Sequence, residues 1–286
     1  MPSLLNIQKQ HNALKTLKNS VADLSNYTQR NTICYYSNWL FSPDDLCGIN
    51  DQDTIGFMEM CNGLNYKKGV DLILHTPGGD VGATESIINH LNEVFNGDIR
   101  SIVPQIAMSG GTMIACSTKE IIMGKQSSLG PVNPIFKGLP AHSIISEIEK
   151  IIDDIDENPS RIAIWNPILS NLNLTLLDTC YKSIEWANEI LENSLKNNMF
   201  KDSKSNEKVK NIIDILASPK ITKSHDRHLN VSRCKEIGLN ITMMEDNPVE
   251  EDLILSIHRA CMNLLSEINA YKIFVNQKGK FLDFNS

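Results

Sequence analysis

The chain has 286 residues and a formal net charge of −7, with 41% hydrophobic and 21% charged residues. This length and composition are ordinary for one large or two small globular domains with a sizeable core. The acidic balance argues against nucleic acid or an anionic membrane surface as the main partner. No run reaches the roughly 18 apolar residues of a membrane span, and the N-terminal segment has no secretory signal pattern. We therefore expect a cytoplasmic protein that does not span a membrane.

The cysteines are scattered along the chain, at Cys34, Cys47, Cys61, Cys116, Cys180, Cys234 and Cys261. Their number is odd and no two form a CxxC pair, so we expect reduced, buried thiols and neither a disulfide framework nor a zinc site. The chain also has no HExxH motif, no Asp-rich calcium loop and no GxGxxG dinucleotide fingerprint. We therefore expect no metal and no cofactor.

The N-terminal segment begins with a predicted helix. Residues 4–25 place apolar side chains at helical spacing, which predicts an amphipathic helix that docks on the body or on another subunit. Residues 31–37 are typical of a strand, and residues 50–64 of a helix with Asp51 or Asp53 as its N-cap.

An alternation of strands and helices follows and sets the fold class. The predicted strands lie at 70–75, 100–107 and 119–123, and the predicted helices between them at 81–95 and 110–117. Strands that alternate with helices in this way imply right-handed crossovers and a mostly parallel, buried sheet. The fold class predicted is therefore α/β, with helices on the faces of the sheet.

The remainder of the chain is mainly helical. Apolar residues at spacings of three and four predict helices at 142–153, 173–198, 208–217 and 252–270, and a further helix that ends at Gly238. Between the first two, residues 153–167 form an acidic connection that contains prolines.

Two glycine pairs carry the strongest chemical signal. His-Thr-Pro-Gly-Gly at 75–79 and Met-Ser-Gly-Gly-Thr at 108–112 each follow an apolar strand. A strand that ends in glycine and opens a helix leaves free N–H groups pointing at one spot. Two such ends side by side can hold an oxyanion, with Ser109 beside it, which indicates acyl transfer through a serine nucleophile.

The plainer alternative for the Ser-Gly-Gly sequence is a tight strand-to-helix turn with no catalytic role. The loop Leu-Gly-Pro-Val-Asn-Pro at 129–134 can return to the same edge of the sheet, which favours a site there.

These motifs also carry a resemblance to a known family. Residues 75–79, 107–112 and 129–134 stand in the order and spacing of the serine dehydrogenase proteinase family, which is similar to signal peptide peptidase A and, more distantly, to the Clp protease subunit. The likeness runs from about residue 30 to 242 and includes the late stretches Thr222–Asp226 and Cys234–Leu239. It implies a Clp/crotonase-like fold with βα crossovers, a helical C-terminal part and a serine endopeptidase activity. The family name does not imply a dehydrogenase.

The resemblance also implies a domain division and a set of partners. Together with the apolar spacing at the two ends of the chain, it predicts an N-terminal amphipathic helix (1–28), a Clp/crotonase-like peptidase domain (29–245), and a C-terminal helix and tail (246–286). Relatives of this kind form rings or stacked assemblies, so we expect a homo-oligomer that acts on a peptide or protein substrate. By the same resemblance, Ser109 matches the nucleophile, and the N–H groups of Gly79 and Gly110 match the oxyanion donors.

The catalytic base is the least determined part of the site. A Clp-type histidine would lie near residues 129–134, where this chain has none, whereas relatives of signal peptide peptidase A use a lysine. A lysine acts as a base only if burial lowers its pKa towards neutrality. We favour Lys182, on a rather apolar helix, and hence a Ser–Lys dyad. Lys150, among acidic neighbours, and His225, next to Asp226, are the alternatives.

Three functions therefore stay open from the sequence. The first is the serine peptidase. The second is a crotonase-like enzyme that acts on a coenzyme A thioester, since the same paired N–H groups would hold a thioester oxyanion. The third is a non-catalytic scaffold, because one fold can host several roles.

Overall fold

The computed structural model describes residues 4–42, 45–136, 138–173, 175–201, 206–218 and 224–285. The Thr222–Lys223 part of the late motif lies outside this range. A seven-stranded sheet forms the centre of the described chain, in the order β10-β5-β3-β2-β1-β11-β12. Its strands are β1 (Asn31–Ser37), β2 (Val70–His75), β3 (Ile99–Val103), β5 (Glu120–Met123), β10 (Ile241–Met243), β11 (Ala270–Asn276) and β12 (Phe281–Asn285). Neighbours from β10 to β1 are parallel, which confirms the predicted α/β class.

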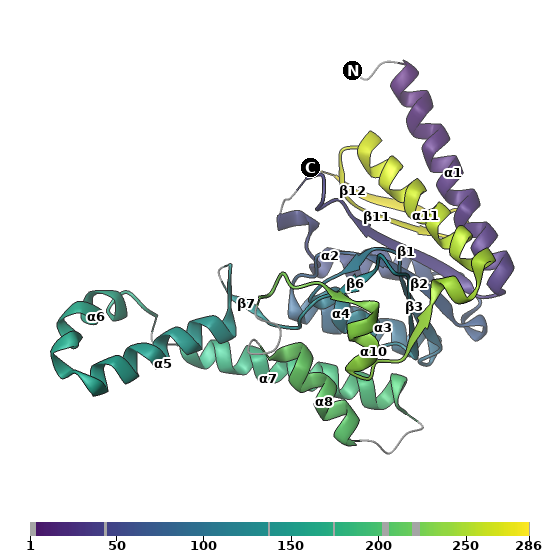
Figure 1. Cartoon of the computed structure of the whole chain (residues 1–286). Helices are drawn as coiled ribbons and strands as arrows, with labels where there is room; N and C mark the ends of the chain where they lie inside the picture. The colour runs from purple at the N-terminus through teal and green to yellow at the C-terminus, as the bar shows by residue number, and fades with distance from the viewer. Residues whose placement is uncertain are drawn as a thin grey trace.

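Helices cover both faces of this sheet (Figure 1). On one face α1 (Leu4–Thr28) and α11 (Pro248–Glu267) lie side by side and pack on one hydrophobic core. The other face carries the larger core, to which α2 (Asp51–Cys61), α3 (Val81–Phe95) and α4 (Gly110–Cys116) contribute. Alternate strand residues enter the two cores, and this explains why apolar residues in β1 and β2 follow one another directly instead of standing only at every second position.

The predicted strand 100–107 is divided in two. After β3 the chain bends at Pro104 and Gln105 and resumes as β4 (Ile106–Ala107). This short strand pairs with β6 (Ser128–Leu129), which in turn pairs with β9 (Leu229–Asn230) in a three-stranded sheet. Because Thr76 forms a bridge with Ala107, the segment after β2 and the segment after β3 end beside each other.

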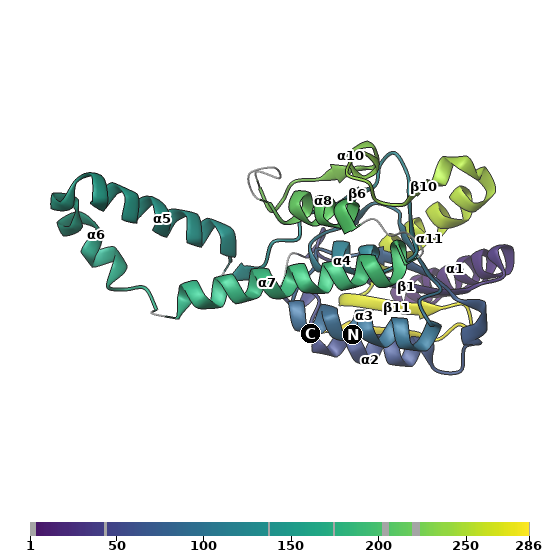
Figure 2. The same cartoon turned by 90° about the horizontal axis from the view of Figure 1, so that it is seen from below.

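The part of the chain between residue 140 and α11 is mainly helical. Its helices are α5 (Ala141–Glu157), α6 (Ile162–Leu169), α7 (Leu176–Ser194), α8 (Asn206–Ala217) and α10 (Val231–Glu236). Of these, α7, α8 and α10 contribute to the larger core. Figure 2 shows that α5, α6 and the start of α7 project from the body, whereas the rest of α7 lies along it. The acidic connection expected at 153–167 in fact contains the end of α5, a 3₁₀ turn and most of α6.

Short elements complete the described chain. A two-stranded ribbon is formed by β7 (Ile135–Phe136) and β8 (Leu139–Pro140). The helical turns are 3₁₀ turns at Asp45–Cys47, Tyr66–Lys68, Pro159–Arg161 and Met244–Asp246 and a π-helical turn at Leu195–Met199. In the described residues, no helix has the length and apolar character needed to cross a bilayer.

The C-terminal tail expected after the last helix forms a hairpin instead. Strand β11 pairs antiparallel with β1, and β12 pairs antiparallel with β11. In this position β11 buries Ile273, Phe274 and Val275 and covers an edge that β1 would otherwise expose. The C-terminal segment is therefore part of the central sheet.

A buried carboxylate joins the amino ends of the parallel strands. The side chain of Asp71, in β2, is 0% exposed and forms ion pairs with Arg30 at 2.8 Å and with Arg100 at 2.7 Å. The two arginines also contact Asp98 and Glu250. This cluster lies at the end of β2 opposite to the glycine turn that follows the strand.

We expect Asp71→Asn to lower the free energy of unfolding by about 3 kcal/mol, because both guanidinium groups lose the charged partner that they share. Urea unfolding followed by circular dichroism measures this. Asp23→Asn, at an exposed position on α1, is the matched control and should stay within about 0.5 kcal/mol of the wild type. An equally small effect of Asp71→Asn would contradict a stabilising role of the cluster.

Candidate active site

Ser109 occupies a strained turn at the start of α4. Its φ of 49° and ψ of −112° fit the second residue of a type II′ turn, a position that favours glycine. The turn is closed by the Gly111 N–H, which donates to the Met108 carbonyl at 2.7 Å. Serine at a helix start normally caps the helix with its hydroxyl, but Ser109 makes no such capping bond. The turn therefore fixes the backbone of Ser109, and the hydroxyl of its half-buried side chain is not used to cap the helix.

The Gly78–Gly79 turn packs directly against Ser109. The Met108 N–H donates to the Thr76 carbonyl at 3.0 Å and so ties the two turns together. Gly78 has a φ of 90°, and a Cβ on it would lie 2.7 Å from both the Gly110 nitrogen and the Ser109 Cβ. Glycine is therefore required at this position for its backbone conformation and for the close approach of the second turn.

Two amides meet beside Ser109. A Cβ on Gly110 would lie 3.4 Å from the Gly79 nitrogen, so the two backbones are adjacent. Within the described residues, neither the Gly79 nor the Gly110 N–H has a hydrogen-bond acceptor. The Gly110 N–H is unpaired because it belongs to the first turn of α4. Two free donors next to a serine hydroxyl are the arrangement that stabilises an oxyanion in acyl transfer.

These groups line a pocket of about 720 Å³. Its other walls come from the β1–α2 connection, from the loop at 132–135 and from α7, with side chains that include Trp39, Val132 and Trp186. The predicted return of the 129–134 loop to this edge is thus confirmed. Ser109 lines an open pocket and does not face a packed interior.

His225 lines the same pocket as Ser109. It is half-buried, and its Nδ1 atom is buried with no hydrogen-bond partner in the described structure. Burial lowers the pKa of this imidazole below its usual 6.5, although the charge of Asp226 opposes the shift. A neutral histidine with an unpaired nitrogen can accept a proton at neutral pH.

Lys182 is not at this pocket. Its side chain is 72% exposed and forms an ion pair at 2.7 Å with Asp178, one turn earlier on α7. The hydrogen bond and the charge of Asp178 raise the lysine pKa, which is the opposite of what a base requires. The apolar side of α7 faces the body, and Ser183 and Trp186 from this helix reach the pocket instead. Within the chain, the geometry therefore gives no support to Lys182 as the partner of Ser109.

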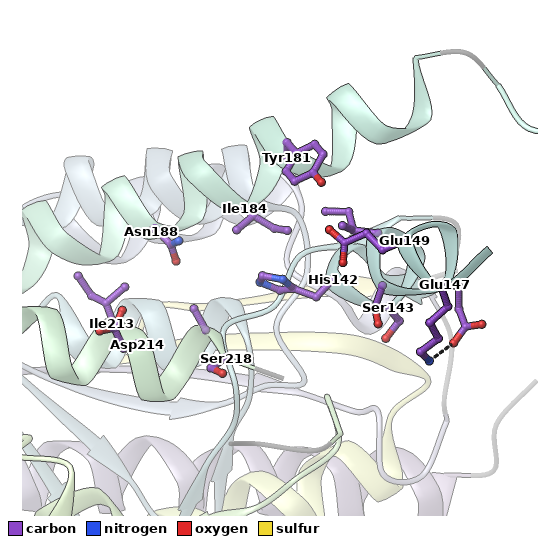
Figure 3. A pocket seen from close by; sticks show the side chains of 14 residues that line it. His142, Ser143, Glu147, Glu149, Tyr181, Ile184, Asn188, Ile213, Asp214 and Ser218 are labelled. Carbon is purple, nitrogen blue, oxygen red and sulfur yellow. Dashed lines mark hydrogen bonds and ion pairs between the residues drawn. The ribbon is translucent and has the colours of Figure 1, made fainter. Parts of the chain in front are cut away.

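Lys150 belongs to a second cavity, of about 730 Å³, between α5, α7 and α8 (Figure 3). It is exposed and forms an ion pair with Glu147 at 2.7 Å, drawn as a dashed line. His142 and Asn188 point into this cavity, but neither Ser109 nor the glycine turns line it. Of the three candidate bases, His225 alone shares a pocket with Ser109.

None of the described residues that line the pocket of Ser109 is a cysteine. All seven cysteines lie in the described ranges, where they are free and buried. Among the same residues, no group of three or more His, Cys, Asp or Glu side chains is placed to hold a metal ion.

Comparison with known proteins identifies the family. The model of the family described as "ClpP-like SDH-type serine proteinase" matches residues 49–264, a range that includes both glycine turns, Ser109 and His225. Uncharacterized protein MJ0137 of Methanocaldococcus jannaschii is 36% identical over 194 residues, which cover 68% of this chain and 60% of the relative. Uncharacterized protein MJ1495 of the same organism is 35% identical over 190 residues, which cover 65% of this chain and 56% of the relative.

The chain thus spans less than two thirds of the length of both archaeal relatives. The family match covers well over half of this chain and agrees with the mostly parallel α/β fold. It also confirms the resemblance drawn from the three glycine-containing motifs. The chain belongs to the family of ClpP-like SDH-type serine proteinases.

Proposed function

We propose that this protein is a serine peptidase in which Ser109 is the nucleophile, Gly79 and Gly110 form the oxyanion hole and His225 is the base. The observation that carries the proposal is the meeting of two amides, with no acceptor in the described part of the chain, beside a strained serine that lines an open pocket. Strained backbone at a non-glycine residue costs about 1–3 kcal/mol and is concentrated at functional sites.

The proposed reaction follows from these positions. The Ser109 Oγ attacks the carbonyl carbon of a peptide bond while His225 accepts the hydroxyl proton. The N–H groups of Gly79 and Gly110 donate to the resulting oxyanion. His225 then gives the proton to the leaving amine, and an acyl-enzyme remains on Ser109. Water activated by the same histidine hydrolyses this ester and restores the serine.

His225 is preferred to Lys182 as the base for two reasons. It lines the pocket of Ser109, whereas Lys182 extends into solvent. Burial favours the neutral imidazole, whereas Asp178 favours the charged ammonium. The scaffold function is distinguished from the peptidase by the labelling experiment that follows, and coenzyme A binding measured by calorimetry would favour the crotonase-like function.

We expect a fluorophosphonate probe to label Ser109 in the wild type, and peptide mapping by mass spectrometry locates the adduct. Ser109→Ala and Ser109→Gly should both abolish labelling, but they should differ in stability. Glycine relieves the positive-φ strain that alanine retains, so we expect Ser109→Gly to be the more stable by about 1 kcal/mol. A folded wild type that the probe does not label would favour the scaffold function. Equal stability of the two variants would contradict backbone strain at Ser109.

We expect His225→Gln to lower kcat for peptide hydrolysis by roughly 10²–10⁴-fold, because the serine loses its proton acceptor. His11→Gln, at an exposed position on α1, is the matched control and should leave kcat unchanged. If Lys182→Met abolished hydrolysis while His225→Gln did not, lysine and not histidine would be the base.

We expect the pH profile of kcat/KM to show an acid limb below pH 6.5. The imidazole must be neutral to act, and burial lowers the pKa of His225 below its usual value. Activity should therefore be full at pH 7–8 and should fall as the pH drops through this lowered pKa. A lysine base with the raised pKa of Lys182 would give activity that still increases above pH 10. Circular dichroism at each pH controls for unfolding.

A further inference from the structure

A buried ion pair joins α2 to the C-terminal hairpin on the side of the sheet that carries the larger core. The Lys272 Nζ contacts Asp53 Oδ2 at 2.8 Å and Oδ1 at 3.0 Å, and the two side chains are 2% and 0% exposed. Placing two charges in the interior carries a desolvation penalty that their attraction offsets only partly. The pair is therefore a weak source of stability, and its contacts indicate what else it does.

Asp53 holds one peptide group in place. Its Oδ2 accepts from the Asn50 N–H at 2.9 Å, as part of the capping box of α2. That N–H belongs to the same planar peptide group as the Ile49 carbonyl, which accepts from the Asp80 N–H at 2.8 Å. The carboxylate thus fixes the orientation of the Ile49–Asn50 peptide, and through it the residue that follows Gly79.

Ile49 in turn holds the peptide group that carries the proposed oxyanion donor. The Ile49 N–H donates to the Gly78 carbonyl at 2.7 Å. The carbonyl of Gly78 and the N–H of Gly79 lie in one trans peptide plane and point in opposite directions. With the carbonyl bound to Ile49, the Gly79 N–H has to point away from Ile49, and its nitrogen lies beside Gly110.

A second connection runs through Tyr35. Its hydroxyl donates to Asp53 Oδ2 at 3.1 Å and also interacts with the Thr76 hydroxyl. The Thr76 Oγ1 accepts from the Gly78 N–H at 3.2 Å. Asp53 is thereby linked to both sides of the Gly78–Gly79 turn, once through Ile49 and once through Thr76.

A glycine pair needs such support. Without Cβ atoms, the peptide between Gly78 and Gly79 has few steric barriers to rotation, and a rotated peptide would turn the donor away from the oxyanion. We propose that Asp53 and Lys272 are positioning residues that lock the Gly78–Gly79 peptide with its N–H directed at the oxyanion. Their role as positioning residues rests on the proposed peptidase function, but the orientation of the peptide can be measured without it.

Lys272 serves this arrangement by keeping the carboxylate an acceptor. Burial raises the pKa of Asp53 above its usual value, and the neighbouring ammonium offsets part of that shift. An ionised carboxylate accepts at both oxygens and receives the Asn50, Tyr35 and Lys272 donors together. A protonated Asp53 would carry a proton on one of its two oxygens, and that oxygen would act as a donor.

Nuclear magnetic resonance tests the lock directly. Gly79 and Gly111 are the only glycines preceded by glycine, so an HNCO spectrum of protein labelled with 1-¹³C,¹⁵N-glycine contains only their two peaks. We expect Asp53→Asn and Lys272→Met to shift or split the Gly79 peak and to leave Gly111 in place. Asp71→Asn, which removes a buried carboxylate at the opposite end of the sheet, should move neither. An unmoved Gly79 peak in folded Asp53→Asn would overturn the proposal.

Kinetics of the same variants supply the functional result. We expect kcat to fall roughly 10–100-fold with KM within about threefold, because a misdirected donor affects the transition state more than substrate binding. Asp71→Asn should lose stability without this fall in kcat. If Asp53→Asn does not fold, Tyr35→Phe removes only one hydroxyl and should give a smaller change of the same kind. If the Gly79 peak shifts in Asp53→Asn while the wild type neither reacts with the probe nor hydrolyses peptides, the positioning of the Gly78–Gly79 peptide is upheld and the peptidase function is overturned.

Discussion

The pairing of two glycine turns is the constraint on which this site depends. The Met108 N–H bonds to the Thr76 carbonyl, and the missing Cβ of Gly78 lets the second turn approach the Ser109 backbone. Strand β2 lies in the seven-stranded sheet and β4 in the three-stranded sheet, and the parallel bridge between Thr76 and Ala107 brings the two turns together. The short strand β4 makes this approach possible, because the bend after β3 takes the serine turn towards Thr76. A site built on strand ends in this way has a rigid support.

The ion-pair cluster and the candidate site lie at opposite ends of β2. At the amino end of β2, Asp71 joins two arginines. At its carboxyl end, hydrogen bonds direct peptide groups towards the pocket and leave the Gly79 and Gly110 amides without a partner among the described residues. Unpaired donors and a positive-φ serine are unfavourable in isolation, and they persist only where surrounding contacts determine them. Asp53, Lys272 and Tyr35 supply such contacts from the core.

Local patterns in the sequence predicted most of the framework and the serine turn that the structure places at the pocket. The strand before Gly78, the helix at 81–95 and the serine turn depend on residues close in sequence, so their signals are strong. Helix faces and distant partners were harder to predict. The apolar positions around Lys182 suggested burial, but the Asp178–Lys182 spacing was the better signal, since it allows an exposed ion pair. His225 reaches the pocket, and Lys272 reaches Asp53, only through the folded sheet, so spacing in the sequence could not reveal either pairing.

The most direct test of the account is a crystal structure of the protein treated with a peptide boronic acid, which mimics the tetrahedral intermediate. The account predicts a covalent bond from the Ser109 Oγ to boron, with one boronate oxygen about 2.7–3.1 Å from the nitrogens of both Gly79 and Gly110. A boronate oxygen directed away from those two amides, or an inhibitor bound in the second cavity with Ser109 unmodified, would contradict it.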